Sequence, residues 1–394
     1  MANKKYHSDA AKKKPHYFNQ NKMQQITVIY NCTSGDACSP HGAGPALRGM
    51  RQISRYCRFS KQNYLYLYYM QLTLSLDIPP LSKPISYTDN ILLTGSCFTE
   101  HIADRLQQHK FKVLSNPHGI MFNPLSVAGN LDGYLDGKKY DHNGLFRLNE
   151  LWNSWDHHTR YSNIDANEAL DQINQSQEEA AIFIKKADWV IITLGSAFQY
   201  YLKENGTPVA NNHRAPAQWF DKKLLPINEI VDALNTTLEN LFSINHFVQV
   251  MFTISPVRHI RDGVVDNNRS KARLIEAVHA ICDQSQRAFY FPAYELVIDI
   301  LRDYRYYDID FVHPNYLATT YVWEHFTKSC ITPVAQEVML LVQDIITARS
   351  HRSRFPETMA HKKFKDNYAD KAKALMERYP YLDLSEEIKY FSTI

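Results

Sequence analysis

The strongest constraint on the fold is a repeated alternation of short apolar runs with longer amphipathic segments. Four runs have the length of buried strands, at residues 91–94, 187–194, 246–254 and 288–291. Segments with apolar residues at helical spacing lie between them, at residues 99–108, 168–186, 227–242 and 270–282. Strands separated by helices of this length predict an α/β fold, a parallel sheet covered by helices on both faces. Ligands of such sheets bind beyond the carboxyl ends of the strands.

Charge divides the chain into chemically different parts. Residues 1–69 contain 11 Lys and Arg against two Asp, a local charge of +9, whereas the whole chain carries only +3 and residues 70–394 carry −6. We expect residues 1–69 to be a disordered or non-native N-terminal extension. Residues 70–330 should form the α/β domain, with residues 331–394 as a helical extension packed on it. A nucleic-acid-binding arm with tyrosines at 64, 66, 68 and 69 is the alternative, but we expect no nucleic-acid partner.

Cysteine use and hydropathy define the expected environment. Of six Cys, only Cys97, Cys282 and Cys330 lie in residues 70–394, and no C-x-x-C pair occurs. This spacing favours neither a disulfide framework nor a zinc site, so a reducing cytoplasm is expected. The N-terminus lacks the apolar core of a secretory signal, and no window is long and apolar enough for a membrane span. We therefore expect a soluble cytoplasmic protein. Its oligomeric state is not encoded in these features.

A serine stands where the first core strand should end and a helix begin, in Gly95-Ser96-Cys97-Phe98. A serine at such a turn is lifted clear of the sheet, and its N–H near the positive end of the helix can bind an oxyanion. The alternative is a turn with an N-cap serine. Cys97 is a rival nucleophile, but we expect a small buried thiol there.

A second candidate motif is Asp310-Phe311-Val312-His313, at a predicted turn that opens a helix. Asp and His three residues apart can lie on one face, so that the carboxylate orients the imidazole while its other nitrogen faces a nucleophile. A serine needs such a base, because a neutral hydroxyl is a poor nucleophile. A capping Asp310 beside a surface His313 is the alternative. Together with Ser96, the pair favours a serine hydrolase.

These motifs resemble the GSCFA family, which belongs to the SGNH/GDSL hydrolase-like superfamily. The family's first motif stands here with Thr99 in place of Ala. Further segments resemble the family in order, at residues 116–124, 154–158, 193–197, 209–214, 255–259, 262–263, 270–272 and 310–313. The resemblance runs from about residue 70 to the C-terminus. It implies an SGNH-like three-layer sandwich with a central parallel sheet.

The resemblance also implies roles for single residues. Ser96 would be the nucleophile, His313 its base and Asp310 the residue that orients the imidazole. The oxyanion hole would contain the N–H groups of Ser96 and Gly119. Gly195, the glycine of the superfamily's third conserved block, would also belong to it. The Asn that normally completes the hole, two residues after that glycine, is replaced here by Ala197. One such donor is worth roughly 10²–10³ in rate, so either another side chain replaces it, with Asn123 and Asn212 as the candidates, or the enzyme is slow.

Other polar side chains are expected to bind the substrate. His158, His213 and Arg258 are candidates for a polar substrate, and Arg258 could instead pair with Asp262. A metal site built from Asp156, His157, His158, His213 and His259 lacks any supporting spacing, so we expect no metal and no other cofactor. The resulting hypothesis is a serine esterase or acyl hydrolase for a small polar acyl ester, such as an O-acetylated carbohydrate. An acyltransferase using the same serine and a non-catalytic carbohydrate-binding protein stay open.

Overall fold

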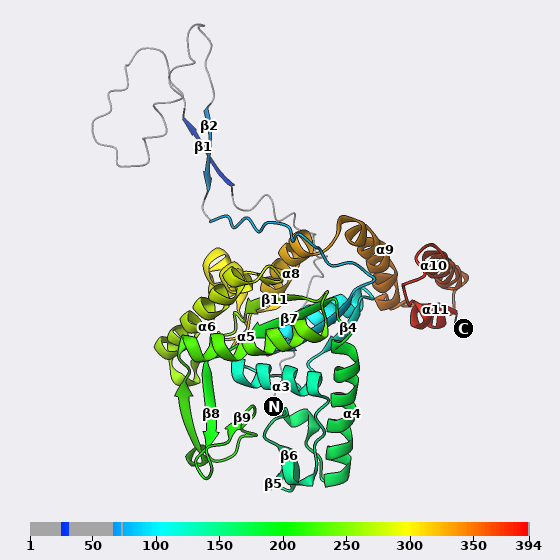
Figure 1. Cartoon of the computed structure of the whole chain (residues 1–394). Helices are drawn as coiled ribbons and strands as arrows, with labels where there is room; N and C mark the ends of the chain where they lie inside the picture. The colour runs from blue at the N-terminus through cyan, green and yellow to red at the C-terminus, as the bar shows by residue number, and fades with distance from the viewer. Residues whose placement is uncertain (1–24, 31–65, 72–73, 393–394) are drawn as a thin grey trace, which may run out of the picture. The chain divides into compact units, whose positions relative to one another are not determined.

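The computed structural model describes residues 25–30, 66–71 and 74–392 and divides into two units, Met1–Ser75 and Leu76–Ile394 (Figure 1). In the first unit, β1 (Gln25–Tyr30) pairs antiparallel with β2 (Tyr66–Gln71). The sequence analysis missed this hairpin, because most of residues 1–69 show no strand periodicity. The rest of the expected extension lies outside the described residues.

The second unit is built on a five-stranded parallel sheet in the order β12-β11-β7-β3-β4. Its strands are β3 (Asn90–Gly95), β4 (Lys112–Ser115), β7 (Trp189–Leu194), β11 (Gln249–Ile254) and β12 (Ala288–Tyr290). The four predicted strands are confirmed, each within a few residues. The edge strand β4 was missed, because it has only four residues and none of them is fully buried.

Helices cover both faces of this sheet, as the α/β prediction requires. Successive strand residues point to opposite faces, so Ile91 and Leu93 pack with α2 (Cys97–Gln108) and α8 (Tyr316–Cys330). Leu92 packs on the other side with the remaining helices of the sandwich. These are α3 (Pro124–Asp136), α4 (Ala166–Ile184), α5 (Ile227–Ile244) and α6 (Val264–Gln284). Figure 1 shows α8 and α3 on opposite sides of the sheet, which makes three layers.

Two small antiparallel sheets form in chain segments that connect the strands and helices of the sandwich. The sequence analysis did not predict them. They are the hairpin β5 (Leu145–Leu148) and β6 (Leu151–Ser154), and the sheet β10-β8-β9, with β8 (Phe198–Leu202), β9 (Pro208–Val209) and β10 (Phe220–Leu224). Trp155, Val209 and Phe220 form a minor core that joins them. The loops of this region carry His157, His158 and His213.

Short helical turns connect the larger elements. They lie at His142–Gly144, Thr159–Tyr161, Ala217–Trp219, Ile260–Asp262, α7 (Ala293–Glu295), Leu296–Leu301 and Tyr304–Tyr306.

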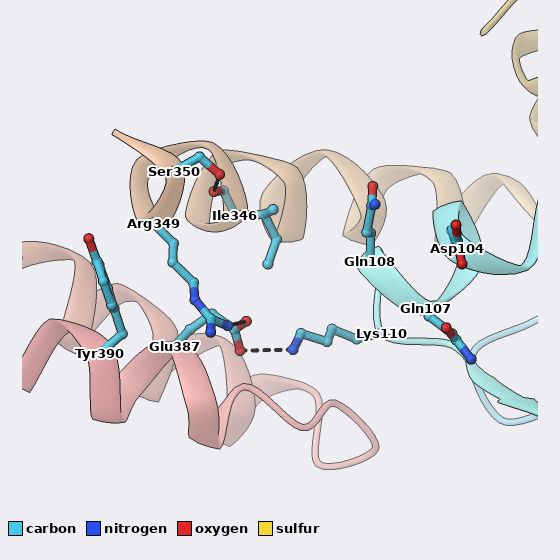
Figure 2. A pocket seen from close by; sticks show the side chains of 9 residues that line it. All are labelled: Asp104, Gln107, Gln108, Lys110, Ile346, Arg349, Ser350, Glu387 and Tyr390. Carbon is cyan, nitrogen blue, oxygen red and sulfur yellow. Dashed lines mark hydrogen bonds and ion pairs between the residues drawn. The ribbon is translucent and has the colours of Figure 1, made fainter. Parts of the chain in front are cut away.

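The C-terminal region is helical, with α9 (Pro333–Ser350), α10 (Met359–Arg378) and α11 (Ser385–Ser392). Apolar residues of all three, including Val338, Ala372 and Phe391, join the core that also contains Phe98 of α2. A buried carboxylate, Glu387 on α11, receives ion pairs from Lys110 and Arg349 (Figure 2). Within the described ranges, none of the helices combines the length and the apolar character that crossing a membrane would require.

Candidate active site

Ser96 lies at the carboxyl end of β3, at the point where α2 begins. It is the N-cap of α2, and its Oγ accepts a hydrogen bond from the N–H of Phe98 at 3.3 Å. The side chain is fully buried. Its own N–H donates to Thr193 O at 3.0 Å, which ties Ser96 to the neighbouring strand β7. Ser96 therefore combines a capping role with the strand-end position expected of a nucleophile.

Asp310 and His313 form a hydrogen-bonded pair in the loop before α8. Asp310 Oδ2 accepts from His313 Nδ1 at 2.7 Å, and Asp310 Oδ1 accepts from the N–H groups of Val312 and His313. The hydrogen bond from the His313 side chain, followed by those two N–H groups, lowers the pKa of Asp310 to about 2. Both side chains are about half exposed. The pair has the geometry in which a carboxylate orients an imidazole.

The loop that carries this pair is joined to the sheet through Arg258, which follows β11. The Arg258 N–H donates to Val312 O at 3.2 Å, and its guanidinium lies 4.4 Å from the Tyr307 ring centroid. The alternative pairing of Arg258 with Asp262 is wrong, because Asp262 pairs with Lys222. Arg258 thus holds the Asp310/His313 loop beside the carboxyl ends of the central strands.

No hydrogen bond joins Ser96 Oγ to His313 within the described part of the chain. His259 lies near both Ser96 and His313. A Cβ added to Gly195 would meet Ser96 Cβ at 3.3 Å and His259 Nε2 also at 3.3 Å, so both atoms lie next to Gly195. His313 is near enough to His259 to lower the pKa of His259.

The expected backbone donors of the oxyanion hole all have acceptors in the structure. The N–H of Gly119 donates to Asn116 O at 2.7 Å, and that of Gly195 donates to Phe122 O at 2.8 Å. Gly119 has φ +82°, and a Cβ on it would lie 2.2 Å from His158 Cβ. Only glycine fits at this close approach.

The two asparagines expected to complete the hole make local hydrogen bonds. Asn123 is the N-cap of α3: its Oδ1 accepts from the Ser126 N–H at 2.8 Å, and its Nδ2 donates to Ser126 Oγ at 2.8 Å. Asn212 Oδ1 accepts from the Arg214 N–H at 3.3 Å, within the turn that follows β9. Neither side chain has a hydrogen bond to Ser96 or His313.

His158 and His213 lie together in the loops next to Gly119. His213 Nε2 contacts Ser154 O at 2.7 Å, while its Nδ1 is buried and has no hydrogen-bond partner among the described residues. His158 Nδ1 accepts from the Arg160 N–H at 3.3 Å. Burial is the largest cause that lowers the pKa of each imidazole, and Arg160 lowers that of His158 further. Both side chains therefore favour the uncharged form more than a free histidine does.

The sequence analysis gave no chemical role to Lys271, the most unusual residue near Ser96. This lysine of α6 is 1% exposed, and its Nζ donates to Gly195 O and to Ser255 O, both at 2.6 Å. No carboxylate pairs with it within the described ranges. Burial lowers its pKa to about 7. The available signal was a lysine in line with Leu274, Val278 and Ile281 on the apolar stripe of residues 270–282.

The arrangement offers groups for acyl chemistry and little for a metal. Among the described residues, no group of three or more His, Cys, Asp or Glu side chains is placed to hold a metal ion. The Ser96 hydroxyl, the imidazoles of His259 and His313 and the amino group of Lys271 lie near the carboxyl ends of the central strands. Such side chains can transfer protons and stabilise a developing negative charge.

Comparison with known proteins places the chain in a family. Residues 90–326 match the GSCFA family, and residues 342–393 match the GSCFA domain protein, C-terminal domain. No curated protein matches the sequence. An acetyl xylan esterase (Est2A) from the rumen bacterium Butyrivibrio proteoclasticus resembles 72% of this chain over 69% of its own, with 10% identity and a TM-score of 0.30. That likeness is too weak to carry an argument about activity. The family match covers more than half of the sequence and includes the Ser96 and His313 motifs, so this chain belongs to the GSCFA family.

Proposed function

We propose that the protein is a serine esterase, with an SGNH-like arrangement of Ser96, His313 and Asp310. Ser96 Oγ attacks the carbonyl carbon of an acyl ester while His313 Nε2 takes the hydroxyl proton. The proton then passes to the leaving alkoxide, and water releases the acid from Ser96 by the same steps. Asp310 holds the imidazole in the required tautomer through Nδ1.

The observation that carries this proposal is the 2.7 Å hydrogen bond between Asp310 and His313, in a loop fastened beside the strand ends. The bond from His313 Nε2 to Ser96 Oγ has to form when substrate binds, because the two are not bonded in the free protein. Catalytic hydrogen bonds commonly tighten in this way.

Cys97 is the weaker candidate for the nucleophile. Burial, with a smaller contribution from Glu100, raises the pKa of its thiol. A thiol with a raised pKa carries little thiolate at neutral pH, and the thiolate is the reactive form. Lys271 acts in the opposite direction but does not reverse the shift. These pKa effects favour Ser96 as the attacking group.

The substrate class is inferred from polar side chains in the loops around the proposed site. His158, His213 and Arg258 offer hydrogen bonds and one positive charge, which suit a small polar acyl ester, with an O-acetylated carbohydrate as one example. An acyltransferase would use the same serine and pass the acyl group to a second hydroxyl. A non-catalytic binding protein is a second candidate, and the engaged N–H groups of Ser96, Gly119 and Gly195 are the observation that favours it.

Hydrolysis of a small activated ester, p-nitrophenyl acetate, tests the proposal. We expect Ser96→Ala and His313→Ala to lose more than about 10³-fold in kcat/KM. The matched control is His246→Ala, which removes an exposed His in the turn before β11, away from the carboxyl end of that strand. Equal turnover by the wild type and Ser96→Ala would contradict a serine esterase that uses Ser96. Added alcohol acceptors that yield transesterified product would instead indicate the acyltransferase.

A further inference from the structure

The space beside the Cα of Gly195 is bordered by Ser96 and His259. A Cβ at that position would lie 3.1 Å from Phe122 Cδ1, 3.3 Å from Ser96 Cβ and 3.3 Å from His259 Nε2. These distances are tighter than ordinary van der Waals contact, so even a methyl group would press on these neighbours. The proposed nucleophile and an imidazole nitrogen thus lie close to the same point, within reach of a carbonyl group that Ser96 attacks.

His259 Nε2, which faces this space, is buried and has no hydrogen-bond partner among the described residues. The residue is nevertheless held firmly. Its N–H donates to Asn267 Oδ1 at 2.8 Å, and its ring packs edge-on against Phe122, with ring centroids 5.2 Å apart. Buried polar atoms almost always have partners, so an exception on a fixed ring points to a partner that arrives later.

The environment of His259 keeps the imidazole uncharged. Burial is the main cause, and the nearby side chains of Lys271, His313 and Lys222 act in the same direction, so the pKa falls to about 3. Among the described residues no carboxylate bonds to the ring, in contrast to His313, which has Asp310. A neutral imidazole of such low basicity is a poor base but remains a hydrogen-bond donor from one nitrogen.

The usual donors are accounted for elsewhere. The N–H groups of Ser96, Gly119 and Gly195 bond to backbone carbonyls, and the amide of Asn123 caps α3. Ala197 stands where SGNH-like enzymes would carry the side-chain donor. The expected donors of the oxyanion hole are therefore already engaged. His259 Nε2, beside Ser96, is buried and has no hydrogen-bond partner among the described residues.

We propose that His259 is a catalytic residue, the side-chain donor of the oxyanion hole, and that the oxyanion forms beside the backbone of Gly195, within reach of His259 Nε2. This inference rests on the proposed esterase chemistry. When Ser96 Oγ bonds to the carbonyl carbon and its proton moves to His313, the carbonyl oxygen takes up the negative charge. His259 Nε2–H donates to that oxygen, and the hydrogen bond persists until the carbonyl re-forms and the alkoxide leaves with the proton from His313.

Lys271 holds this arrangement together as a positioning residue. Its Nζ donates to the carbonyls of Gly195 and Ser255, which follow β7 and β11. His259 lies four residues beyond Ser255, and Gly195 borders the space. The ammonium thus fixes the two strand ends whose separation sets the size of the hole.

The rate of covalent labelling by a fluorophosphonate tests the inference, because its phosphoryl oxygen occupies the oxyanion position. The full chain is labelled as wild type, Ser96→Ala, His259→Leu, His259→Gln and the control His246→Gln. We expect labelling of the wild type and none of Ser96→Ala. His259→Leu should be slower by about 10²–10³-fold. His259→Gln, which keeps a donor, should recover much of that loss, and His246→Gln should match the wild type.

A second variant keeps the test decisive if His259→Leu does not fold. Gly195→Ala keeps the His259 side chain but places a methyl group against its Nε2 and against Ser96 Cβ, and we expect it to lose labelling by a similar factor with an unchanged circular dichroism spectrum. Wild-type labelling rates in folded His259→Leu or folded Gly195→Ala would overturn the inference while the esterase proposal stands. An unlabelled, folded wild type would overturn the esterase proposal, and this inference with it.

Discussion

Two fully buried charges in the same unit are stabilised in different ways. Glu387 on α11 is 1% exposed and lies 2.9 Å from Lys110 Nζ and 2.6 Å from Arg349, so its charge is compensated twice (Figure 2). Lys271 on α6 is equally buried, but its contacts are two carbonyl oxygens. The Glu387 carboxylate thus has two counter-ions, whereas the Lys271 amino group has, among the described residues, hydrogen bonds to carbonyl groups and no ion pair.

This difference separates a structural site from a functional one. A buried charge costs free energy unless it is paired, and a pair between helices fixes how they pack. Glu387 of α11 joins Arg349 of α9 to Lys110, which follows α2. The three residues line a pocket of ≈ 590 Å³. An unpaired buried charge is costly to keep, and such groups with shifted pKa values gather at sites of chemistry. Lys271 donates hydrogen bonds to the residues that follow β7 and β11 beside Ser96. We therefore interpret its burial as functional.

One helix connects the two regions. The N-terminus of α2 presents Ser96, and the chain just after its C-terminus carries Lys110, which pairs with Glu387. Asp104, Gln107 and Gln108 of the same helix line the pocket shown in Figure 2. The C-terminal helices thus support the helix on which the proposed nucleophile depends, although their polar contacts lie at its other end.

Breaking the paired charge should give the largest loss of stability. Glu387→Leu leaves Lys110 and Arg349 without their shared carboxylate, and both are partly exposed and can hydrate. We expect the free energy of unfolding to fall by about 3 kcal/mol, at the low end for a broken buried pair, with little change in kcat of the folded fraction. Urea denaturation measures it. The control Glu386→Gln removes an exposed partner of Arg349 and should cost less than about 1 kcal/mol; equal costs would refute the distinction.

Removing the unpaired charge should act on catalysis instead. Lys271→Met keeps the apolar stem but leaves the carbonyls of Gly195 and Ser255 without a donor, so the ends of β7 and β11 shift. We expect kcat to fall roughly 100-fold, as for a misplacement of about 1 Å in a site. Ester hydrolysis at saturating substrate measures the fall. A variant of normal kcat and much lower stability would make Lys271 merely structural, like Glu387.

The lysine should also leave a pH signature in stability. Its pKa is lowered to about 7 in the folded protein from 10.5. Between these values the unfolded chain binds a proton that the folded chain does not, so the free energy of unfolding should rise with pH, by at most about 1.4 kcal/mol per unit. Below pH 7 the full cost of burying the charge remains. Denaturation across pH 7–10 should show this slope in the wild type but not in Lys271→Met; parallel curves would contradict it.

The smallest effect is expected at Asn123. Asn123→Ala removes the N-cap of α3, which costs about 1 kcal/mol of stability. Because both amide atoms bond to Ser126, we expect turnover to change little. Paired measurements of unfolding and of kcat/KM decide the point. A rate loss of 10²-fold or more would instead assign the oxyanion donor to Asn123.

Sequence periodicity was sufficient for the central architecture and insufficient for the site's details. The β3, β7, β11 and β12 strands were predicted because buried strands of a parallel sheet read as apolar runs. The inserted small sheets escaped prediction because strands such as Pro208–Val209 are too short to show any period. Pairing of Asp310 with His313 follows from three-residue spacing on a turn. The proposed role of His259 could not be predicted from the sequence. Its side chain is surrounded by Gly195, Phe122 and Lys271, which only the fold brings together.

The most direct test of the account is where a fluorophosphonate attaches to the folded, full-length chain. Peptide mass spectrometry distinguishes Ser96 from the adjacent Cys97 and from every other hydroxyl. We predict a single adduct on Ser96, lost in Ser96→Ala and strongly slowed in His313→Ala. An adduct on Cys97 or another residue, or no adduct on an intact folded protein, would contradict the assignment of Ser96 as the nucleophile.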